Sequence, residues 1–215
     1  GGKGAKYFTT DICDGQAQGH DGMNYSLASR EFIADMIEIQ AGATPFDAGV
    51  FVASCDKGMP ANLMAAARLN IPSIVFTGGI MAAGPNMLKL EQLGTYSARF
   101  ERGEITKEEF CYAKENACPS CGACSFMGTA STMQVMAEAL GLALPGTALL
   151  PAISPDLMTK AYEVGVRALE LAKEGIRPSD ILTEKAFENV TGNSQAGKTE
   201  VGNLYDRHRS GCRNG

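Results

Sequence analysis

The sequence predicts an α/β fold, in which a parallel sheet is flanked by helices in a three-layer, doubly wound arrangement. Two β-prone runs, 48–54 and 73–77, enclose a segment at 61–70 that is rich in Ala, Leu and Met. A strand, a helix and a second strand within about thirty residues form a βαβ unit, which requires parallel strands covered by helices. Pro60 suits the first turn of the intervening helix.

The composition is that of an ordinary globular domain. Of the 215 residues, 45% are hydrophobic and 20% are charged, which excludes a disordered or fibrous class. A net charge of -5 argues against nucleic acid as a partner, because phosphate binding needs clustered Lys and Arg. The apolar stretch at 140–153 is interrupted by Gly and Pro, and the amino terminus has no signal pattern. We therefore expect a cytoplasmic protein with no membrane partner.

The segments around the βαβ unit are predicted in order. Residues 8–23 have the pattern of a strand end followed by an irregular loop. Apolar spacing predicts a helix at 26–40, with Asn24 or Ser26 as its N-cap. Residues 83–103 are predicted to be partly helical.

The second half of the chain carries several helix boundaries. Thr106 opens a capping box that starts a helix, and a longer helix is predicted from about Thr129. Ser154, followed by Pro and Asp, is the N-cap of an amphipathic helix that Gly175 ends. Ser179 can cap a last helix.

The first candidate site is Cys55-Asp56-Lys57, directly after the first strand. Open α/β sheets keep their ligand crevice at the carboxyl ends of strands. Asp56 suits either a helix cap or a polar site. Lys57 beside a carboxylate suits an ion pair, a general base with a lowered pKa, or a carbamate that ligates a metal.

The second candidate is a loop that contains Cys118, Cys121 and Cys124, with two residues between successive cysteines. Cys111 lies upstream of this loop. Thiolates at this spacing can hold a soft metal or an iron-sulfur cluster. The ferredoxin and zinc-ribbon patterns are incomplete, so reduced cysteines without a metal are the alternative. A total of seven cysteines fits metal or catalytic use better than a disulfide framework.

The third candidate is the Gly-rich loop with Asp11, Asp14 and Asp21. Carboxylates suit Mg²⁺, which prefers oxygen ligands, although such loops are also common solvated turns. His20 suits a surface role better than metal ligation.

Residues 192–199 match the P-loop pattern G-x-x-x-x-G-K-[ST] letter for letter. That motif needs a buried strand before it and a helix after it, and only 16 residues follow Thr199. We interpret the match as coincidental.

Three longer signatures resemble those of the dihydroxy-acid dehydratase / 6-phosphogluconate dehydratase family. The first is Asp14-Gly15 with Gly19-His20-Asp21-Gly22-Met23 and Tyr25-Ser26-Leu27. The second is Ser54-Cys55-Asp56-Lys57 with Pro60 and Arg68-Leu-Asn70-Ile-Pro72. The third is Ala117-Cys118-Pro119-x-Cys121-Gly122-x-Cys124 with Met127-x-Thr129-Ala130-x-Thr132-Met133. The resemblance runs in register over about residues 5 to 190.

The resemblance implies a hydro-lyase that removes water from a 2,3-dihydroxy carboxylic acid to give a 2-keto acid. It implies that Cys55 and Cys124 ligate an iron-sulfur cluster, with 2Fe-2S favoured over 4Fe-4S. It also implies that Asp14 and Asp56 hold Mg²⁺ together with a carbamylated, metal-bridging Lys57. The cluster would act as Lewis acid on the C3 hydroxyl, and Mg²⁺ would acidify the C2 proton.

The favoured activity is dihydroxy-acid dehydratase of branched-chain amino acid biosynthesis, because the cysteine loop looks like those enzymes. Residues 127–133 look more like the sugar-acid dehydratases, so an arabonate, xylonate or 6-phosphogluconate dehydratase is the alternative. A non-catalytic metal-binding module is a further one. For the full-length protein we expect a small dihydroxy acid as substrate and a homodimer or homotetramer.

The resemblance also predicts the domain organisation. Residues 1–190 correspond to an iron-sulfur and Mg²⁺-binding α/β domain, incomplete at its amino end, where a further cluster cysteine is expected. The family's carboxy-terminal β-rich domain, with a Glu for Mg²⁺ and a Ser base, is absent. Residues 191–215 are predicted to be an irregular tail that is not native family sequence, as in a truncated or frame-shifted product. We therefore expect this chain alone to be inactive.

Overall fold

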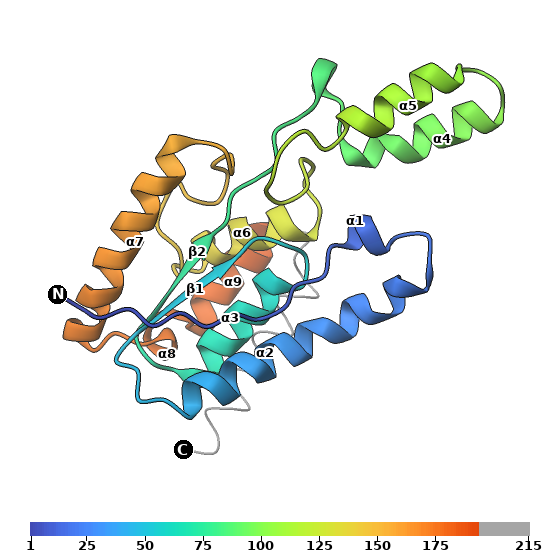
Figure 1. Ribbon diagram of the computed structural model, residues 1–215. Coiled ribbons are helices and arrows are strands. Elements are labelled where there is room, and N and C mark those ends of the chain that lie inside the picture. Colours follow the sequence, from blue (N-terminus) through green and yellow to red (C-terminus); the bar gives the residue numbers. More distant parts are fainter. Residues whose placement is uncertain (194–215) are drawn as a thin grey trace.

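The parallel sheet predicted from the βαβ unit is present. The computed structural model of the chain describes residues 1–193 (Figure 1). Strand β1, Gly49–Ala53, pairs in parallel with β2, Ser73–Thr77, so that Gly49 lies opposite Ser73 and Ala53 opposite Thr77. Helix α3, Gly58–Leu69, makes the crossover between them. The two strands form the one sheet found among the described residues.

Helices cover both faces of this sheet, which gives the expected three layers. Successive side chains of a strand point to opposite faces. Val75 packs in the cluster formed with α3, whereas its neighbour Ile74 packs against α7, Pro155–Glu174. Figure 1 shows α3 and α7 on opposite sides of the strands.

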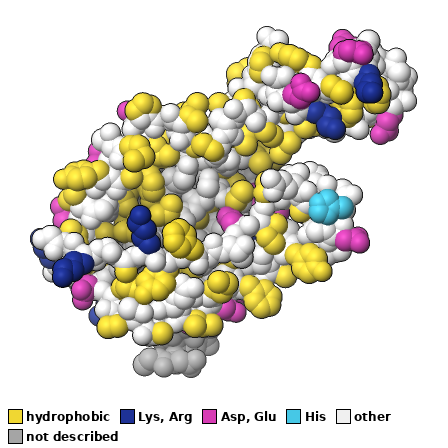
Figure 2. All heavy atoms as spheres, viewed as in Figure 1, with side chains coloured by type: hydrophobic (Ala, Val, Ile, Leu, Met, Phe, Trp, Pro, Cys, Tyr) yellow, Lys and Arg dark blue, Asp and Glu magenta, His cyan; other side chains and the backbone are white. Residues whose placement is uncertain are grey.

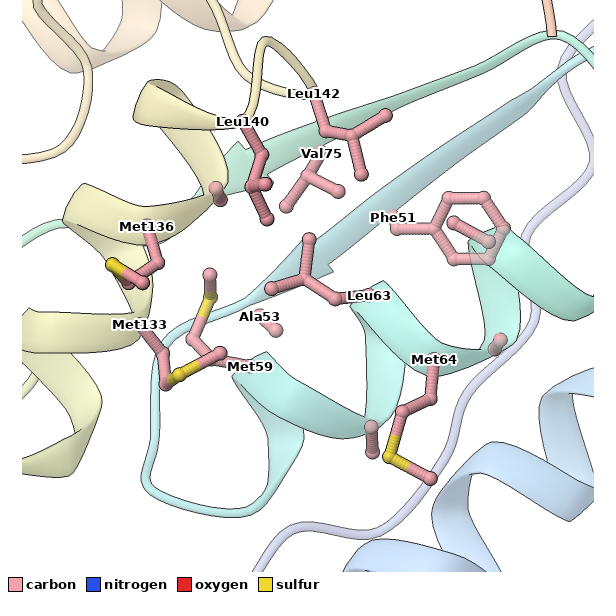
Figure 3. Close-up of a cluster of buried hydrophobic side chains, with 14 of the residues drawn as sticks. Phe51, Ala53, Met59, Leu63, Met64, Val75, Met133, Met136, Leu140 and Leu142 are labelled. Carbon is pink, nitrogen blue, oxygen red and sulfur yellow. The ribbon is translucent and has the colours of Figure 1, made fainter. Parts of the chain in front are cut away.

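The main core lies between the sheet, α3 and α6, Thr129–Ala139 (Figure 3). Leu63 from α3 and Met133 from α6 are almost fully buried there, together with Val75 of the sheet. Each buried side chain of this size stabilises the fold by about 1.5–3 kcal/mol, so this cluster contributes strongly to holding the two helices against the sheet. Methionine, which adapts to irregular gaps, fills much of the space between α3 and α6.

Helix α2, Ser26–Gly42, packs along α3. Arg68 of α3 pairs with Asp35 of α2 at 2.7 Å. The prediction that Asn24 or Ser26 caps α2 is wrong: Tyr25 is the N-cap residue and gives no side-chain cap. The Ser26 hydroxyl instead donates a hydrogen bond to the Asp14 carboxylate.

The segment before α2 contains no strand, so the strand end predicted within residues 8–23 is wrong. The backbone there forms two short helices, α1, Asp14–Ala17, and η1, Asp21–Tyr25. The β-prone residues at 8–10 have no ladder partner among the described residues, and Phe8 remains 81% exposed.

Residues 83–103 are partly helical, as predicted. They contain η2, Pro85–Met87, η3, Leu90–Gln92, and α4, Leu93–Glu101. Helix α5, Lys107–Asn116, begins at the predicted capping box. Helices α4 and α5 form a hairpin that projects from the body (Figure 1).

The last predicted helix is two helices, α8, Pro178–Ile181, and α9, Glu184–Asn193. Ser179 is not a cap but lies inside α8, where its N–H donates to Asn70 Oδ1 at 3.0 Å. By contrast, the Ser154 cap and the Gly175 end of α7 are both confirmed.

Candidate active site

The site is built where the two parallel strands end. β1 runs directly into Ser54-Cys55-Asp56-Lys57, and β2 runs into Gly78. The Gly78 N–H donates to the Ala53 carbonyl at 2.8 Å, which holds the two strand ends together. A side chain at Gly78 would begin 2.9 Å from the Ser54 Cβ, so glycine permits this close approach.

Three of the predicted site residues meet in direct contact. Lys57 Nζ lies 2.9 Å from Asp14 Oδ2 and 3.4 Å from Asp56 Oδ2. The Lys57 side chain is 11% exposed. The structure therefore brings Asp14, which lies 42 positions earlier in the sequence than Asp56, to the end of β1.

These contacts set the protonation of the three groups. Burial acts to lower the pKa of Lys57, but the hydrogen bond to Asp14 and the attraction of Asp56 outweigh it and raise that pKa. Burial acts to raise the pKa of Asp14, yet hydrogen bonds from Lys57 and Ser26 lower it overall. Burial and the adjacent Asp14 raise the pKa of Asp56. In this arrangement Lys57 is an ion-paired ammonium rather than a base with a lowered pKa.

Asp11, rather than Asp56, caps the helix that follows the site. Asp11 Oδ1 accepts a hydrogen bond from the Gly58 N–H at 3.1 Å, at the start of α3. Burial raises the pKa of Asp11, and the charge of Asp56 adds to this effect. The alternative that Asp56 serves as a helix cap is therefore wrong, and the Asp56 carboxylate faces Lys57 instead.

The carboxylate oxygens of Asp14 and Asp56 are ligands that suit a hard cation. The Lys57 ammonium sits between two carboxylates, so this place already stabilises positive charge. Oxygen ligands are those that Mg²⁺ prefers. Within residues 1–193 no three His, Cys, Asp or Glu side chains are close enough to ligate one ion.

Thiols gather beside the carboxylates. Burial raises the pKa of Cys55 to about 11, and the charges of Asp11, Cys13 and Cys124 add to this effect. Burial also raises the pKa of Cys124, followed by the effects of Cys13 and Asp56. These mutual effects place Cys13, Cys55 and Cys124 in one neighbourhood. Soft thiolate donors of this kind fit an iron-sulfur cluster, which would have to displace the thiol protons.

Sequence reasoning missed two residues of this region. Cys13 was not assigned a role, although its place directly before Asp14 was a usable signal. Gln134 on α6 is fully buried, and its Nε2 donates to the Ser54 carbonyl at 3.2 Å. No local pattern marks this glutamine, because its role depends on how α6 packs against the strand ends. Cys118 and Cys121 are exposed in the loop before Cys124.

The P-loop match is not preceded by the strand that the motif requires. Gly192 and Asn193 lie at the end of helix α9, whereas a P-loop follows a strand. The rest of the motif, like most of the predicted tail, lies outside the described residues.

The fold and site define a class of protein: an α/β domain that presents carboxylates, a lysine and thiols at the carboxyl ends of parallel strands. Residues 1–197 match the family described as "Dihydroxy-acid/6-phosphogluconate dehydratase N-terminal". The chain belongs to this dehydratase family.

Relatives named "Dihydroxy-acid dehydratase" align with most of the chain. The protein from Moorella thermoacetica is 47% identical over 193 residues, which cover 88% of this chain and 35% of the relative. The one from Caldicellulosiruptor saccharolyticus is 49% identical over 186 residues, covering 83% and 33%. The one from Nitratidesulfovibrio vulgaris is 44% identical over 193 residues, covering 88% and 35%. The chain thus spans about a third of the length of these curated relatives.

No helix within the described residues has the length and apolar character that crossing a bilayer requires.

Proposed function

We propose that the protein to which this chain belongs is a hydro-lyase that converts a 2,3-dihydroxy carboxylic acid into a 2-keto acid. The favoured activity is that of the dihydroxy-acid dehydratase of branched-chain amino acid biosynthesis. The observation that carries the proposal is the contact of Lys57 with Asp14 and Asp56 beside Cys55 and Cys124. This cluster lies at the strand ends of a domain from a dehydratase family.

In this proposal each side chain has a separate task. Asp14 and Asp56 hold Mg²⁺, and the Ser26 hydroxyl fixes the orientation of Asp14. Lys57, carbamylated when the metal is loaded, supplies a further oxygen. Cys55 and Cys124 hold an iron-sulfur cluster, for which we favour the 2Fe-2S form. The bound metal groups supply Lewis acidity, which helps a hydroxyl depart and stabilises negative charge next to the carboxylate.

The neighbouring groups keep the site in shape. Asp11 fixes the start of α3, so Lys57 is held at the turn between β1 and that helix. Gln134 donates to the carbonyl of Ser54 and so fixes the backbone before Cys55. Rigid support of this kind matters, because small displacements of a reacting group reduce rates strongly.

The decisive variant is Lys57→Arg in the natural polypeptide that contains this chain. Arginine keeps the positive charge but does not form the carbamate. We expect kcat/KM for 2,3-dihydroxyisovalerate to fall by about 10²–10⁴-fold. Lys114→Arg, on the projecting hairpin, is the matched control and should leave the rate unchanged. Full activity of Lys57→Arg would exclude the proposed role of Lys57.

The purified natural polypeptide also distinguishes the proposed function from the metal-binding module and the sugar-acid dehydratase. Iron-sulfur absorption and EPR signals that disappear in Cys55→Ala and Cys124→Ala are expected. Bound zinc without any iron-sulfur signal would favour a non-catalytic metal-binding module. Preferred turnover of arabonate, xylonate or 6-phosphogluconate would favour the sugar-acid alternative, which the similarity of residues 127–133 supports.

A further inference from the structure

The carbonyl of Gly79 joins the two segments that carry Cys55 and Cys124. It lies just beyond the end of β2 and accepts a hydrogen bond from the Ala123 N–H at 2.9 Å. It also accepts a hydrogen bond from the Ser54 hydroxyl at 3.2 Å. Ala123 directly precedes Cys124, and Ser54 directly precedes Cys55. One backbone oxygen is therefore shared by the residues before both cysteines.

Gln134 of α6 binds at the same junction. Its Nε2 donates to the Ser54 carbonyl at 3.2 Å and to the Gly79 carbonyl at 3.5 Å. Three positions earlier on α6, the Ser131 hydroxyl donates to the Cys124 carbonyl at 3.4 Å. Residues three apart are neighbours on one face of a helix. The same face of α6 thus contacts the backbone of both cysteine-bearing segments.

Gln134 makes these contacts out of reach of water. Its side chain is fully buried, and its Oε1 has no hydrogen-bond partner among the described residues. An unpaired buried amide oxygen lowers stability. An apolar side chain of similar size would avoid that loss, so the stability of the core alone does not account for a glutamine here. What Gln134 adds is the pair of donors that faces the two carbonyls.

The cysteine loop is anchored to the body at the end of β2. Figure 2 shows the α4–α5 hairpin, which leads into this loop, as a lobe that projects beyond the body. The loop itself is fixed where the Met81 N–H donates to the Ala123 carbonyl at 2.7 Å. Gly79 has φ +87°, and a side chain there would begin 2.6 Å from the Ala152 Cα. The junction is therefore closely packed, and a displacement at Gly79 would be passed to both cysteine segments.

We propose that Gln134 is a positioning residue, which sets the separation of the Cys55 and Cys124 thiols by holding the Ser54 and Gly79 carbonyls together. The inference rests on the proposed function, in which these two thiols hold one metal group. Two thiolates bind one soft ion tightly only when both reach it without rearrangement. Replacing a residue that orients metal ligands from behind typically lowers metal affinity by about 10–100-fold.

Cadmium binding to the metal-free natural polypeptide tests this role. Cd²⁺ is a soft ion whose thiolate complexes absorb in the ultraviolet, so a titration measures its affinity. Gln134→Leu removes both donors, and we expect the affinity to fall by about 10-fold. Ser54→Ala removes one donor to the Gly79 carbonyl and should lower the affinity by about 3-fold. Thr77→Val is the matched control, because it removes a buried hydrogen bond to the Thr147 carbonyl and should leave the affinity unchanged.

Variants of the thiols separate positioning from a general loosening of the fold. In a Cys124→Ala background no pair remains, so Gln134→Leu should no longer change the affinity for Cd²⁺. In a Cys13→Ala background the effect should persist, because Cys13 belongs to the segment before α1. Circular dichroism and urea unfolding check that each variant is folded. A loss of affinity that is equally large in the Cys124→Ala background, or in Thr77→Val, would overturn the inference.

The positioning role and the proposed function fail separately. If the natural polypeptide dehydrates 2,3-dihydroxyisovalerate but Gln134→Leu leaves the affinity for Cd²⁺ unchanged, the role of Gln134 is wrong and the function stands. If the polypeptide turns over no dihydroxy acid, while Gln134→Leu weakens Cd²⁺ binding only when both thiols are present, the proposed function fails and the role of Gln134 stands.

Discussion

The two halves of the strand-end site balance their charges in opposite ways. In the carboxylate half, Lys57 lies between Asp14 and Asp56, so the charges are compensated within the protein. In the thiol half, Cys55 and Cys124 are partly buried and their raised pKa values keep them protonated and neutral. The first half is organised by an internal cation, whereas the second consists of neutral thiols. A metal group would therefore replace an existing cation on one side and release protons on the other.

The largest expected effect concerns the thiol half. Because the pKa of Cys55 is raised to about 11, its thiolate fraction at pH 8 is about 100-fold below that of a thiol with a pKa of 9.0. We expect Cys55 to be alkylated by iodoacetamide about 100-fold more slowly than an unstructured cysteine, with a rate that rises as pH approaches 11. Peptide mass spectrometry of the metal-free protein measures this for each cysteine.

The same experiment has an internal reference. Cys121 is exposed in the cysteine loop and should react well before Cys55. Denaturation in urea should bring both to the same rate. Fast alkylation of Cys55 in the folded protein at pH 8 would contradict the protonated, shielded state.

The next effect concerns the carboxylate half. Lys57→Met removes the cation and leaves two carboxylates facing each other, which should cost about 2 kcal/mol of unfolding free energy, between surface and buried ion pairs. Mg²⁺ should restore part of that stability, because it returns a positive charge to the same place. Urea unfolding with and without Mg²⁺ measures both effects.

A surface ion pair provides the control for Lys57→Met. Lys160 pairs with Glu163 at 2.7 Å on the outer side of α7. Lys160→Met should cost at most about 0.5 kcal/mol and should not respond to Mg²⁺. If Lys57→Met behaved like this control, the site would not be an electrostatically organised cation site.

Some parts of the structure can be predicted from the sequence, and others cannot. The βαβ unit and the caps of α5 and α7 follow from local patterns, because strand propensity and capping act within a few residues. The N-cap prediction at Ser26 and the cap alternative at Asp56 failed because each side chain bonds a partner other than the nearby helix terminus. Ser26 pairs with Asp14, twelve positions earlier, which only the fold brings close, whereas Asp56 pairs with its neighbour Lys57. The gathering of Cys13 with Cys55 likewise depends on tertiary structure.

The smallest expected effect tests the contact between Ser26 and Asp14. Ser26→Ala should cost about 1 kcal/mol, but the single variant does not show that the loss comes from this contact. A double-mutant cycle with Asp14→Asn does, because contacting residues show a coupling energy and independent ones add. We expect a coupling of at least about 0.5 kcal/mol by urea unfolding.

Ser29 offers the matched control for this cycle, since its hydroxyl donates to the Ser26 carbonyl within the same helix at 2.6 Å rather than to Asp14. Ser29→Ala should therefore add to Asp14→Asn without coupling. Additivity for Ser26 as well would mean that its hydroxyl serves the helix. Coupling for Ser26 alone would mean that its side chain fixes the Asp14 carboxylate of the site instead of capping α2. The first turn of α2 is then less stable than a capped turn, while Asp14 is held in a better-defined position.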